Sequence, residues 1–165
     1  MATAPWIEDR GELRYAAITL RAPIAVLGEQ GPPLNREVFD WLAARRIRPL
    51  GAPFWKFNVI DMDGLMELEI GVGVTDVGEG DKRVHIAVLP AGRYAVVEHV
   101  GHPSTLMAVT KDLLDWAARK DLKWDTTDGS DGERWTARVE FYETDPAVEP
   151  DMDKWLTRLA FKLAG

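Results

Sequence analysis

The sequence contains an internal repeat, and this repeat constrains the fold more than any other feature of the sequence. Three short motifs of the first half recur in the second half in the same order, while the loops between them differ in length. This pattern indicates one supersecondary unit used twice, and duplicated units usually pack around a shared seam. Such a seam is a common place for a small-molecule pocket. The three pairs are residues 15–18 (Tyr-Ala-Ala-Ile) with 94–97 (Tyr-Ala-Val-Val), 40–45 (Asp-Trp-Leu-Ala-Ala-Arg) with 115–120 (Asp-Trp-Ala-Ala-Arg-Lys), and 61–64 (Asp-Met-Asp-Gly) with 151–154 (Asp-Met-Asp-Lys).

Length and charge limit the classes of function. The 165 residues fit a single domain that spans 1–165. The 27 acidic and 20 basic residues give a net charge of -7, which repels phosphate backbones, so we expect no nucleic-acid partner. The chain has no cysteine, which excludes disulfides and thiolate sites, and we expect neither a cofactor nor a metal. We find no signal peptide and no long apolar run, and therefore expect a cytoplasmic protein without a membrane span.

Each half of the sequence reads as strand, helix, strand, strand. We expect half-units at about 12–75 and 84–163, joined by a connector at 76–83. The predicted fold is α+β, an antiparallel sheet with two helices on one face and a ligand groove at the seam. The predicted strands are 13–21, 54–61, 67–74, 84–89, 93–100, 135–143 and 155–163, and the predicted helices are 34–46 and 104–120. One predicted loop contains Gly28, Gly31, Pro32 and Pro33, and another spans 126–133.

The strand at 136–143 offers the clearest candidate chemistry. Its side chains alternate, so the apolar residues Ala137, Val139 and Phe141 share one face, while Arg138, Glu140 and Tyr142 share the other. If the apolar face packs on the helices, Glu140 and Tyr142 face whatever lies on the opposite side. One interpretation is an exposed face on which Glu140 pairs with Arg138 or another cation. The other places Glu140 at the base of a groove beside an aromatic wall, where it attracts lipophilic cations or acts as a general base on water.

The first half supplies weaker candidates. Glu69 faces away from an apolar strand face, so the repeat suggests it as a second carboxylate, against the alternative of a solvated acidic face. Trp55 and Phe57 share a strand face, which makes them buried or pocket-lining together. His99 and His102 flank a strand-to-loop junction outside any metal-ligand motif, and a structural role is the simpler interpretation of His99.

Three segments make the sequence similar to the GyrI-like small-molecule-binding domains, relatives of the effector-binding domains of AraC- and MerR-type regulators. They are residues 89–101, 140–146 and 150–155, and the Glu-x-Tyr-x-x-Asp-Pro element at 140–146 is the most specific. The resemblance implies a tandem of two strand-helix-strand-strand units with a ligand groove at the pseudo-two-fold seam. It also implies that Glu140 is the carboxylate of an aromatic pocket, with Tyr142 beside it. The chain departs from the family where residues 99–104 read His-Val-Gly-His-Pro-Ser instead of His-x-Gly-Pro-Tyr.

The favoured hypothesis is a stand-alone binding module for hydrophobic, aromatic or cationic small molecules, active in drug or toxin resistance. Its ligand-binding candidates are Glu140, Tyr142, Glu69, Trp55, Phe57, His99 and His102. One alternative is a hydrolase of cyclopropane-bearing genotoxins, in which Glu140 or Glu69 activates a water. The other is a protein-interaction module that contacts a partner such as DNA gyrase. The resemblance implies all three, and the residues alone do not separate the first two, because both use the same pocket.

Overall fold

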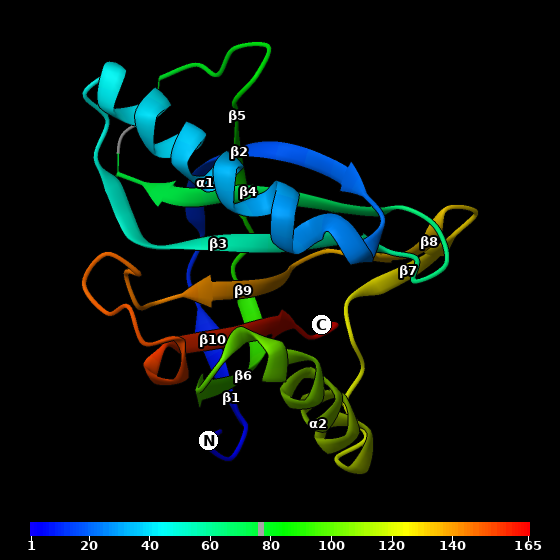
Figure 1. The fold of residues 1–165 in the computed structure, drawn as a ribbon. Helices are drawn as coiled ribbons and strands as arrows, with labels where there is room; N and C mark the ends of the chain where they lie inside the picture. Colours follow the sequence, from blue (N-terminus) through cyan, green and yellow to red (C-terminus); the bar gives the residue numbers. More distant parts are fainter. Residues whose placement is uncertain (76–77) are drawn as a thin grey trace.

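The computed structural model describes residues 1–75 and 78–165 (Figure 1). These residues form two long helices and ten strands, with three short 3-10 turns at Ile24–Val26, Pro103–Thr105 and Met152–Lys154. The helices are α1 (Leu27–Ala44) and α2 (Leu106–Arg119). The strands are β1 (Trp6–Arg10), β2 (Leu13–Ala22), β3 (Pro49–Ile60), β4 (Met66–Val74), β5 (His85–Leu89), β6 (Gly92–Val100), β7 (Thr126–Gly129), β8 (Gly132–Trp135), β9 (Arg138–Tyr142) and β10 (Leu156–Lys162).

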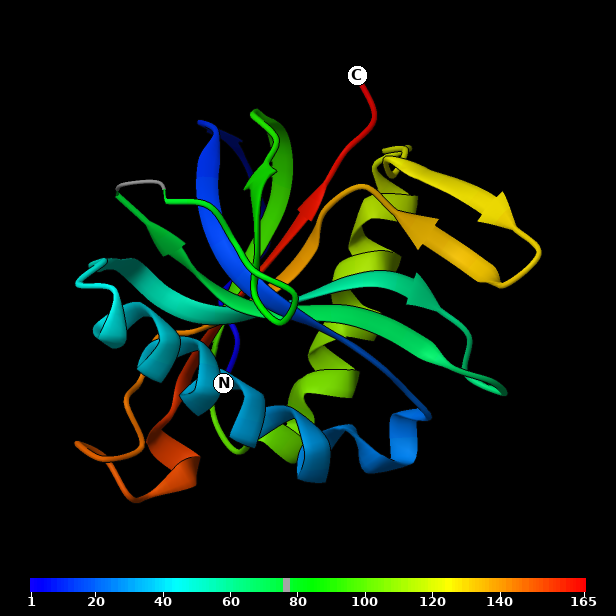
Figure 2. The ribbon, with the colours of Figure 1, turned by 90° about the horizontal axis from the view of Figure 1, so that it is seen from above.

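The strands form one curled antiparallel sheet, visible from above in Figure 2. Its order is β1-β6-β10-β9-β3-β4-β2-β5, and the β7–β8 hairpin joins it through β3. The two halves of the chain meet in the middle, where β9 pairs with β3 through Trp55 and Glu140. Both helices cover the same face of the sheet, α1 over β2 and β4 and α2 over β6 (Figure 1). The α+β prediction with two helices on one face is therefore confirmed.

Alternation along the strands divides the core into two layers. Under the helices, Ile18 and Val72 pack on Val38 of α1, while Val97 and Leu159 pack on Leu113 of α2. The opposite face buries a separate cluster that contains no helix residue: Tyr15, Ala17, Phe54, Leu89, Tyr94, Val96, Ala137, Val139, Phe141 and Ala160. Residues from both halves of the chain build this second layer, so it joins the halves into one core.

The edges of the sheet are exchanged between the halves. β1, from the start of the chain, pairs with β6 of the second half. β5, which follows the predicted connector, pairs with β2 of the first half. Positions 76–77 of that connector lie outside the described residues, and the half-unit boundaries stay a prediction.

Several expected boundaries differ from the structure. The predicted loop around Gly28 and Gly31 is helical, because α1 begins at Leu27. Pro32 and Pro33 are tolerated since they lie on the exposed side of the helix, where water can solvate the carbonyls that lose an N–H partner. The predicted polar loop at 126–133 instead contributes to the β7–β8 hairpin. β3 begins at Pro49, and a register shift between Leu50 and Pro53 accommodates its prolines.

Candidate functional site

A row of three polar side chains on β9 lies under the gap between the helices. Glu140 pairs across the sheet with Trp55 on one side and with Leu159 on the other. Cross-strand partners share a face, and these two pack in the layers of α1 and α2 respectively. Glu140 therefore lies on the helix-bearing face, as do Arg138 and Tyr142 by alternation. The sequence analysis considered that the apolar side chains of β9 pack on the helices. In the structure they point into the opposite layer instead.

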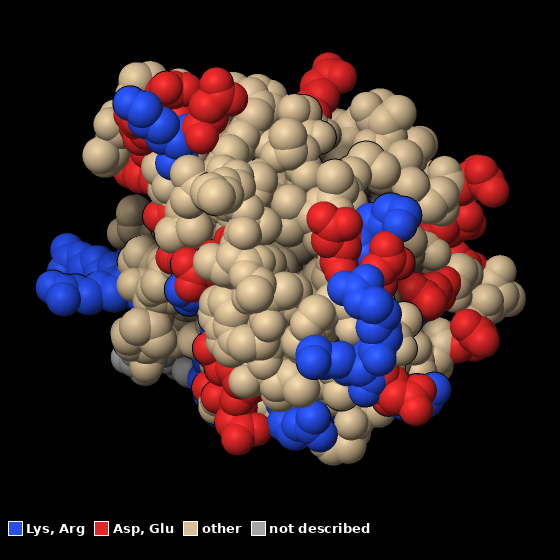
Figure 3. All heavy atoms as spheres, turned by 90° about the horizontal axis from the view of Figure 1, so that it is seen from below, with Lys and Arg blue, Asp and Glu red and all other residues tan. Residues whose placement is uncertain are grey.

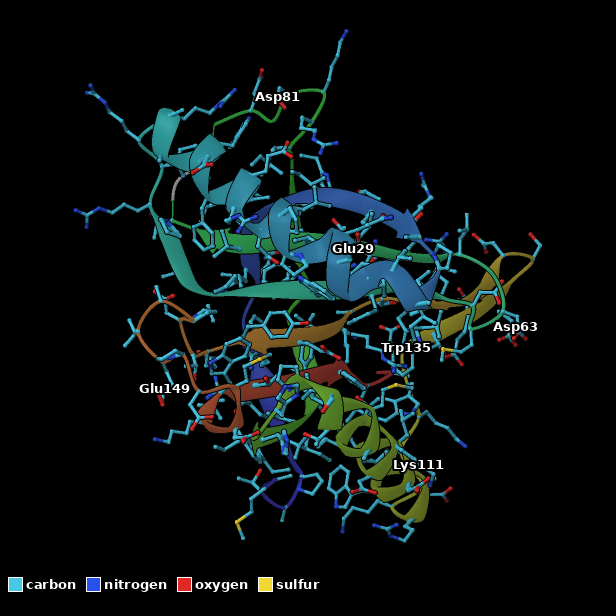
Figure 4. The ribbon with its side chains drawn as sticks, in the orientation of Figure 1. Glu29, Asp63, Asp81, Lys111, Trp135 and Glu149 are labelled. Carbon is cyan, nitrogen blue, oxygen red and sulfur yellow. The ribbon has the colours of Figure 1, made fainter. Side chains whose placement is uncertain are left out.

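We use the name helix seam for the strip of sheet between α1 and α2 that carries Trp55, Phe57, Glu140 and Tyr142. Figure 4 shows this strip, with Trp135 labelled between the two helices. All four of its side chains are half-buried, so solvent still reaches a floor made largely of apolar and aromatic groups. Arg138 continues the row along β9 beyond Glu140.

Glu140 carries the chemistry of the helix seam. Among the described residues, its one hydrogen-bond donor is the Tyr142 hydroxyl, which lies 2.8 Å from Oε1. Loss of solvation raises the pKa of the Glu140 carboxyl, and this outweighs the opposing effects of the Tyr142 hydrogen bond and the positive charge of Arg138. An incompletely hydrogen-bonded carboxylate in a desolvated place favours a cationic partner.

An aromatic wall stands beside this carboxylate. The rings of Trp55 and Tyr142 meet edge to face, with centroids 5.6 Å apart. The Trp55 indole Nε1 donates to Asn35 Oδ1 of α1 at 2.8 Å, which fixes the ring against the helix. Gly31 makes the close approach possible, because a Cβ at this position would overlap the Trp55 ring. Asn35 and Gly31 were not predicted as site residues, since the predicted helix began at 34 and placed Gly31 in a loop; a helical stripe traced back to Leu27 would have found them.

Glu69 belongs to a different environment. It is buried on the sheet face opposite the helices, so the structure does not bring it together with Glu140. Its two oxygens accept four hydrogen bonds: from the Tyr15 hydroxyl at 2.7 Å, His85 Nε2 at 2.6 Å, Asn58 Nδ2 at 2.9 Å and Lys56 Nζ at 3.1 Å. Burial alone would raise the pKa of Glu69, but its partners, led by His85 and Lys56, lower it to about 2. A carboxylate so fully occupied is suited to structure rather than to general-base catalysis.

The two candidate histidines form the junction that leads into α2. His99 Nε2 lies 2.7 Å from Thr105 Oγ1, and Thr105 Oγ1 donates to the carbonyl of His102 at 2.6 Å. His102 Nδ1 accepts from the backbone N–H of Ser104 at 3.1 Å, which caps the turn. Burial lowers the pKa of His99, consistent with a neutral structural imidazole. His99 is separated from Tyr142 by β10, where Thr157 pairs with both.

Two cavities lie away from Glu140. The larger, about 340 Å³, opens between the N-terminal segment and the outer flank of α2, and is lined by Val109, Asp112 and Trp116 among others. The smaller, about 30 Å³, lies on the opposite sheet face beside Phe141. At the helix seam, the Tyr142 side chain lies against the Glu140 carboxylate. Within residues 1–75 and 78–165, no group of three or more acidic or histidine side chains is placed to hold a metal ion.

The surface carries charges of both signs. Figure 3 shows the molecule from below, where lysine and arginine side chains lie next to aspartate and glutamate around an uncharged centre. This mixture on one face, together with the net charge of -7, differs from the basic stripe typical of nucleic-acid-binding proteins. No helix in the described part of the chain is long and apolar enough to cross a membrane.

Residues 3–159 match the model of a family described as GyrI-like small molecule binding domain. The chain is similar in fold to the EcmrR C-terminal domain, with 16% identity, a TM-score of 0.75, and coverage of 98% of this chain and 97% of that one. In an EcmrR–DNA complex the match covers 97% of this chain and 57% of the EcmrR chain, with a TM-score of 0.76 and 17% identity.

Other solved structures share the fold at similar distance. SAV2435 bound to tetraphenylphosphonium has a TM-score of 0.62 and 14% identity, with coverage of 99% of this chain and 95% of that one. A hydrolase from Listeria innocua has a TM-score of 0.64 and 15% identity, with coverage of 97% and 91%. At such identities the likeness concerns the fold alone. Among curated proteins, none matches this sequence significantly.

Proposed function

Because the chain belongs to the GyrI-like small-molecule-binding family, we propose that it binds a lipophilic or aromatic cation at the helix seam, with Glu140 as the counter-charge. One observation carries the proposal. Glu140 is a partly desolvated carboxylate with a single donor among the described residues, and it lies next to the paired rings of Trp55 and Tyr142. Within the described residues, this combination sets it apart from the fully bonded Glu69.

The energetics favour a cation over a neutral ligand. Desolvation makes the Glu140 anion costly in the empty protein, and a bound positive charge offsets part of that cost. The faces of Trp55 and Tyr142 add cation–π attraction, which is strongest where water is excluded. The attraction does not require a hydrogen-bond donor on the ligand, because opposite charges attract without one. Tetraphenylphosphonium, named in the structure of SAV2435, is such a cation.

The proposal extends to the cellular role. We infer a cytoplasmic protein that binds or sequesters toxic amphiphiles and has no nucleic-acid partner. The net charge of -7 and the mixed surface charges support the last point, because an acidic protein is repelled by phosphate backbones.

Titration of the purified protein with tetraphenylphosphonium tests the proposal, with tryptophan fluorescence and calorimetry as the readouts. The change Glu140→Gln keeps the shape of the side chain and removes its charge. We expect it to weaken binding by about tenfold or more, the loss typical of a charge-assisted contact. The change Glu12→Gln is the matched control, because Glu12 is exposed and remote from the seam in sequence and in the sheet order. Equal affinity of the Glu140→Gln variant and the unaltered protein would overturn the proposal.

One property of Glu140 also suits hydrolysis. A carboxylate with a raised pKa and free acceptor positions can take a proton from water, as the alternative hypothesis requires. Mass spectrometry separates the two functions. Incubation with a cyclopropane-bearing alkylating agent leaves the compound intact if the protein only binds it. Products that gain one water, at a rate that falls with Glu140→Gln, would show an enzyme.

A further inference from the structure

Arg138 is a half-buried cation beside the helix seam that the cation-binding proposal does not use. It lies two residues from Glu140 on the same face of β9, a spacing of roughly 7 Å along a strand. Its guanidinium carbon lies 4.7 Å from the centroid of the Trp135 ring and 4.7 Å from that of the Phe161 ring. Two aromatic contacts of this kind hold the guanidinium in place.

The donors of this guanidinium are unused. An arginine carries five N–H donors, yet within residues 1–75 and 78–165 Arg138 donates no hydrogen bond and has no carboxylate within 4.0 Å. Its nitrogens still touch solvent, because the buried nitrogens without a partner in the described chain belong to His99 and Arg158. Arg158, by comparison, pairs with Glu98 and Glu143.

The neighbouring carboxylate does not take up these donors. Arg138 and Glu140 are close enough for their charges to stabilise one another, but the hydrogen bond to Glu140 comes from Tyr142. Burial also makes the charged guanidinium costly and lowers the pKa of Arg138. An oxyanion that reached it would recover this cost through charge-assisted hydrogen bonds, and a guanidinium fork matches a carboxylate in shape.

We propose that Arg138 binds an anionic oxygen of the ligand, so that the helix seam recognises a zwitterionic amphiphile: an aromatic cation that also carries a carboxylate or a similar oxyanion. This inference rests on the proposed function, since Glu140 takes the cationic end. The ligand then lies along β9 with its positive group over Glu140 and its negative group at Arg138. Because each end meets the opposite charge, such a zwitterion binds more tightly than a cation of the same shape without the oxyanion.

Two dyes with the same aromatic cation provide the test. Rhodamine B carries a free carboxylate at neutral pH, and its ethyl ester does not. We expect the unaltered protein to bind the acid at least about fivefold more tightly than the ester in fluorescence anisotropy, a difference of about 1 kcal/mol. Arg138→Gln should remove this preference by weakening the acid alone. Arg138→Met, which keeps an apolar stem between the two rings, should do the same.

The controls keep the two proposals distinguishable. Arg119→Gln removes an exposed arginine of α2 and should leave both affinities unchanged. Glu140→Gln should weaken both dyes. If the protein binds the ester as tightly as the acid and the Arg138 variants bind like the unaltered protein, the inference on Arg138 is wrong while cation binding stands. If neither dye binds, the proposed function fails, and the inference fails with it.

Discussion

At the scale of single residues, Glu69 and Glu140 show how environment separates two carboxylates that the sequence treats alike. Both sit on strands between apolar neighbours, and the repeat suggested related roles. Four donors saturate Glu69, whereas Tyr142 alone donates to Glu140 among the described residues. The difference arises from residues distant in the chain, such as Tyr15 and His85, that pairing of β2, β4 and β5 brings to Glu69. Local alternation therefore identified both carboxylates as candidates but could not assign their roles.

The two carboxylates should change stability with pH in opposite directions. Glu69 has its pKa lowered from 4.5 to about 2, so its contribution is present above pH 4.5 and is lost as the pH falls toward 2. Glu69→Gln should cost about 2–4 kcal/mol at pH 7 and less as the pH falls below 4.5. Glu140 has a raised pKa, so its charge destabilises the fold as the pH rises above 4.5. Glu140→Gln should match the unaltered protein at pH 4 and exceed its stability at pH 7. Urea unfolding at several pH values measures both, and the same sign for the two variants would contradict the assignment.

At the scale of elements, α1 shows what sequence patterns capture and what they miss. The apolar stripe through Val38, Trp41 and Leu42 predicted the helix correctly, because burial on the sheet requires that spacing. The predicted start of the helix was wrong, because Gly31 and the two prolines that follow it are residues that usually interrupt a helix when only the local sequence is considered. Packing reverses this preference: the missing side chain at Gly31 lets Trp55 lie against the helix, and the contact stabilises the first turns. A prediction from neighbouring residues in the sequence cannot detect tertiary contacts of this kind.

A glycine pair on α1 tests this packing. Gly31→Ala places a methyl group inside the Trp55 ring, so the ring or the helix must shift. We expect a loss of about 1–3 kcal/mol in stability and weaker binding of cationic ligands at the helix seam. Gly28→Ala is the control on the same helix, because a Cβ there meets no atom within 4 Å. It should be neutral or slightly stabilising, since alanine is the better helix former. Thermal unfolding and dye titration measure both effects, and equal behaviour of the two variants would refute the role given to Gly31.

At the scale of the whole molecule, the repeat correctly predicted one antiparallel sheet with two helices on one face and a seam between them. It did not predict that the halves exchange edge strands, β1 to the second half and β5 to the first. Strand pairing partners depend on the arrangement of the whole sheet rather than on the sequence of either strand. The exchange and the shared inner layer imply that neither half has a complete core of its own.

Separate expression of residues 1–80 and 81–165 tests this interdependence. Alone, the first fragment leaves β3 without β9 and β2 without β5, and its part of the inner layer, including Tyr15 and Phe54, faces water. The second fragment likewise leaves β6 without β1 and exposes Val96 and Phe141. We expect each fragment alone to lack cooperative unfolding, and an equimolar mixture to recover the circular dichroism and tryptophan fluorescence of the intact chain, because pairing restores the buried apolar surface. The mixture should also recover binding of cationic dyes, since Trp55 and Glu140 come from different fragments and meet only where β3 pairs with β9. Cooperative unfolding of either fragment by itself would show that a half-unit is a self-sufficient domain.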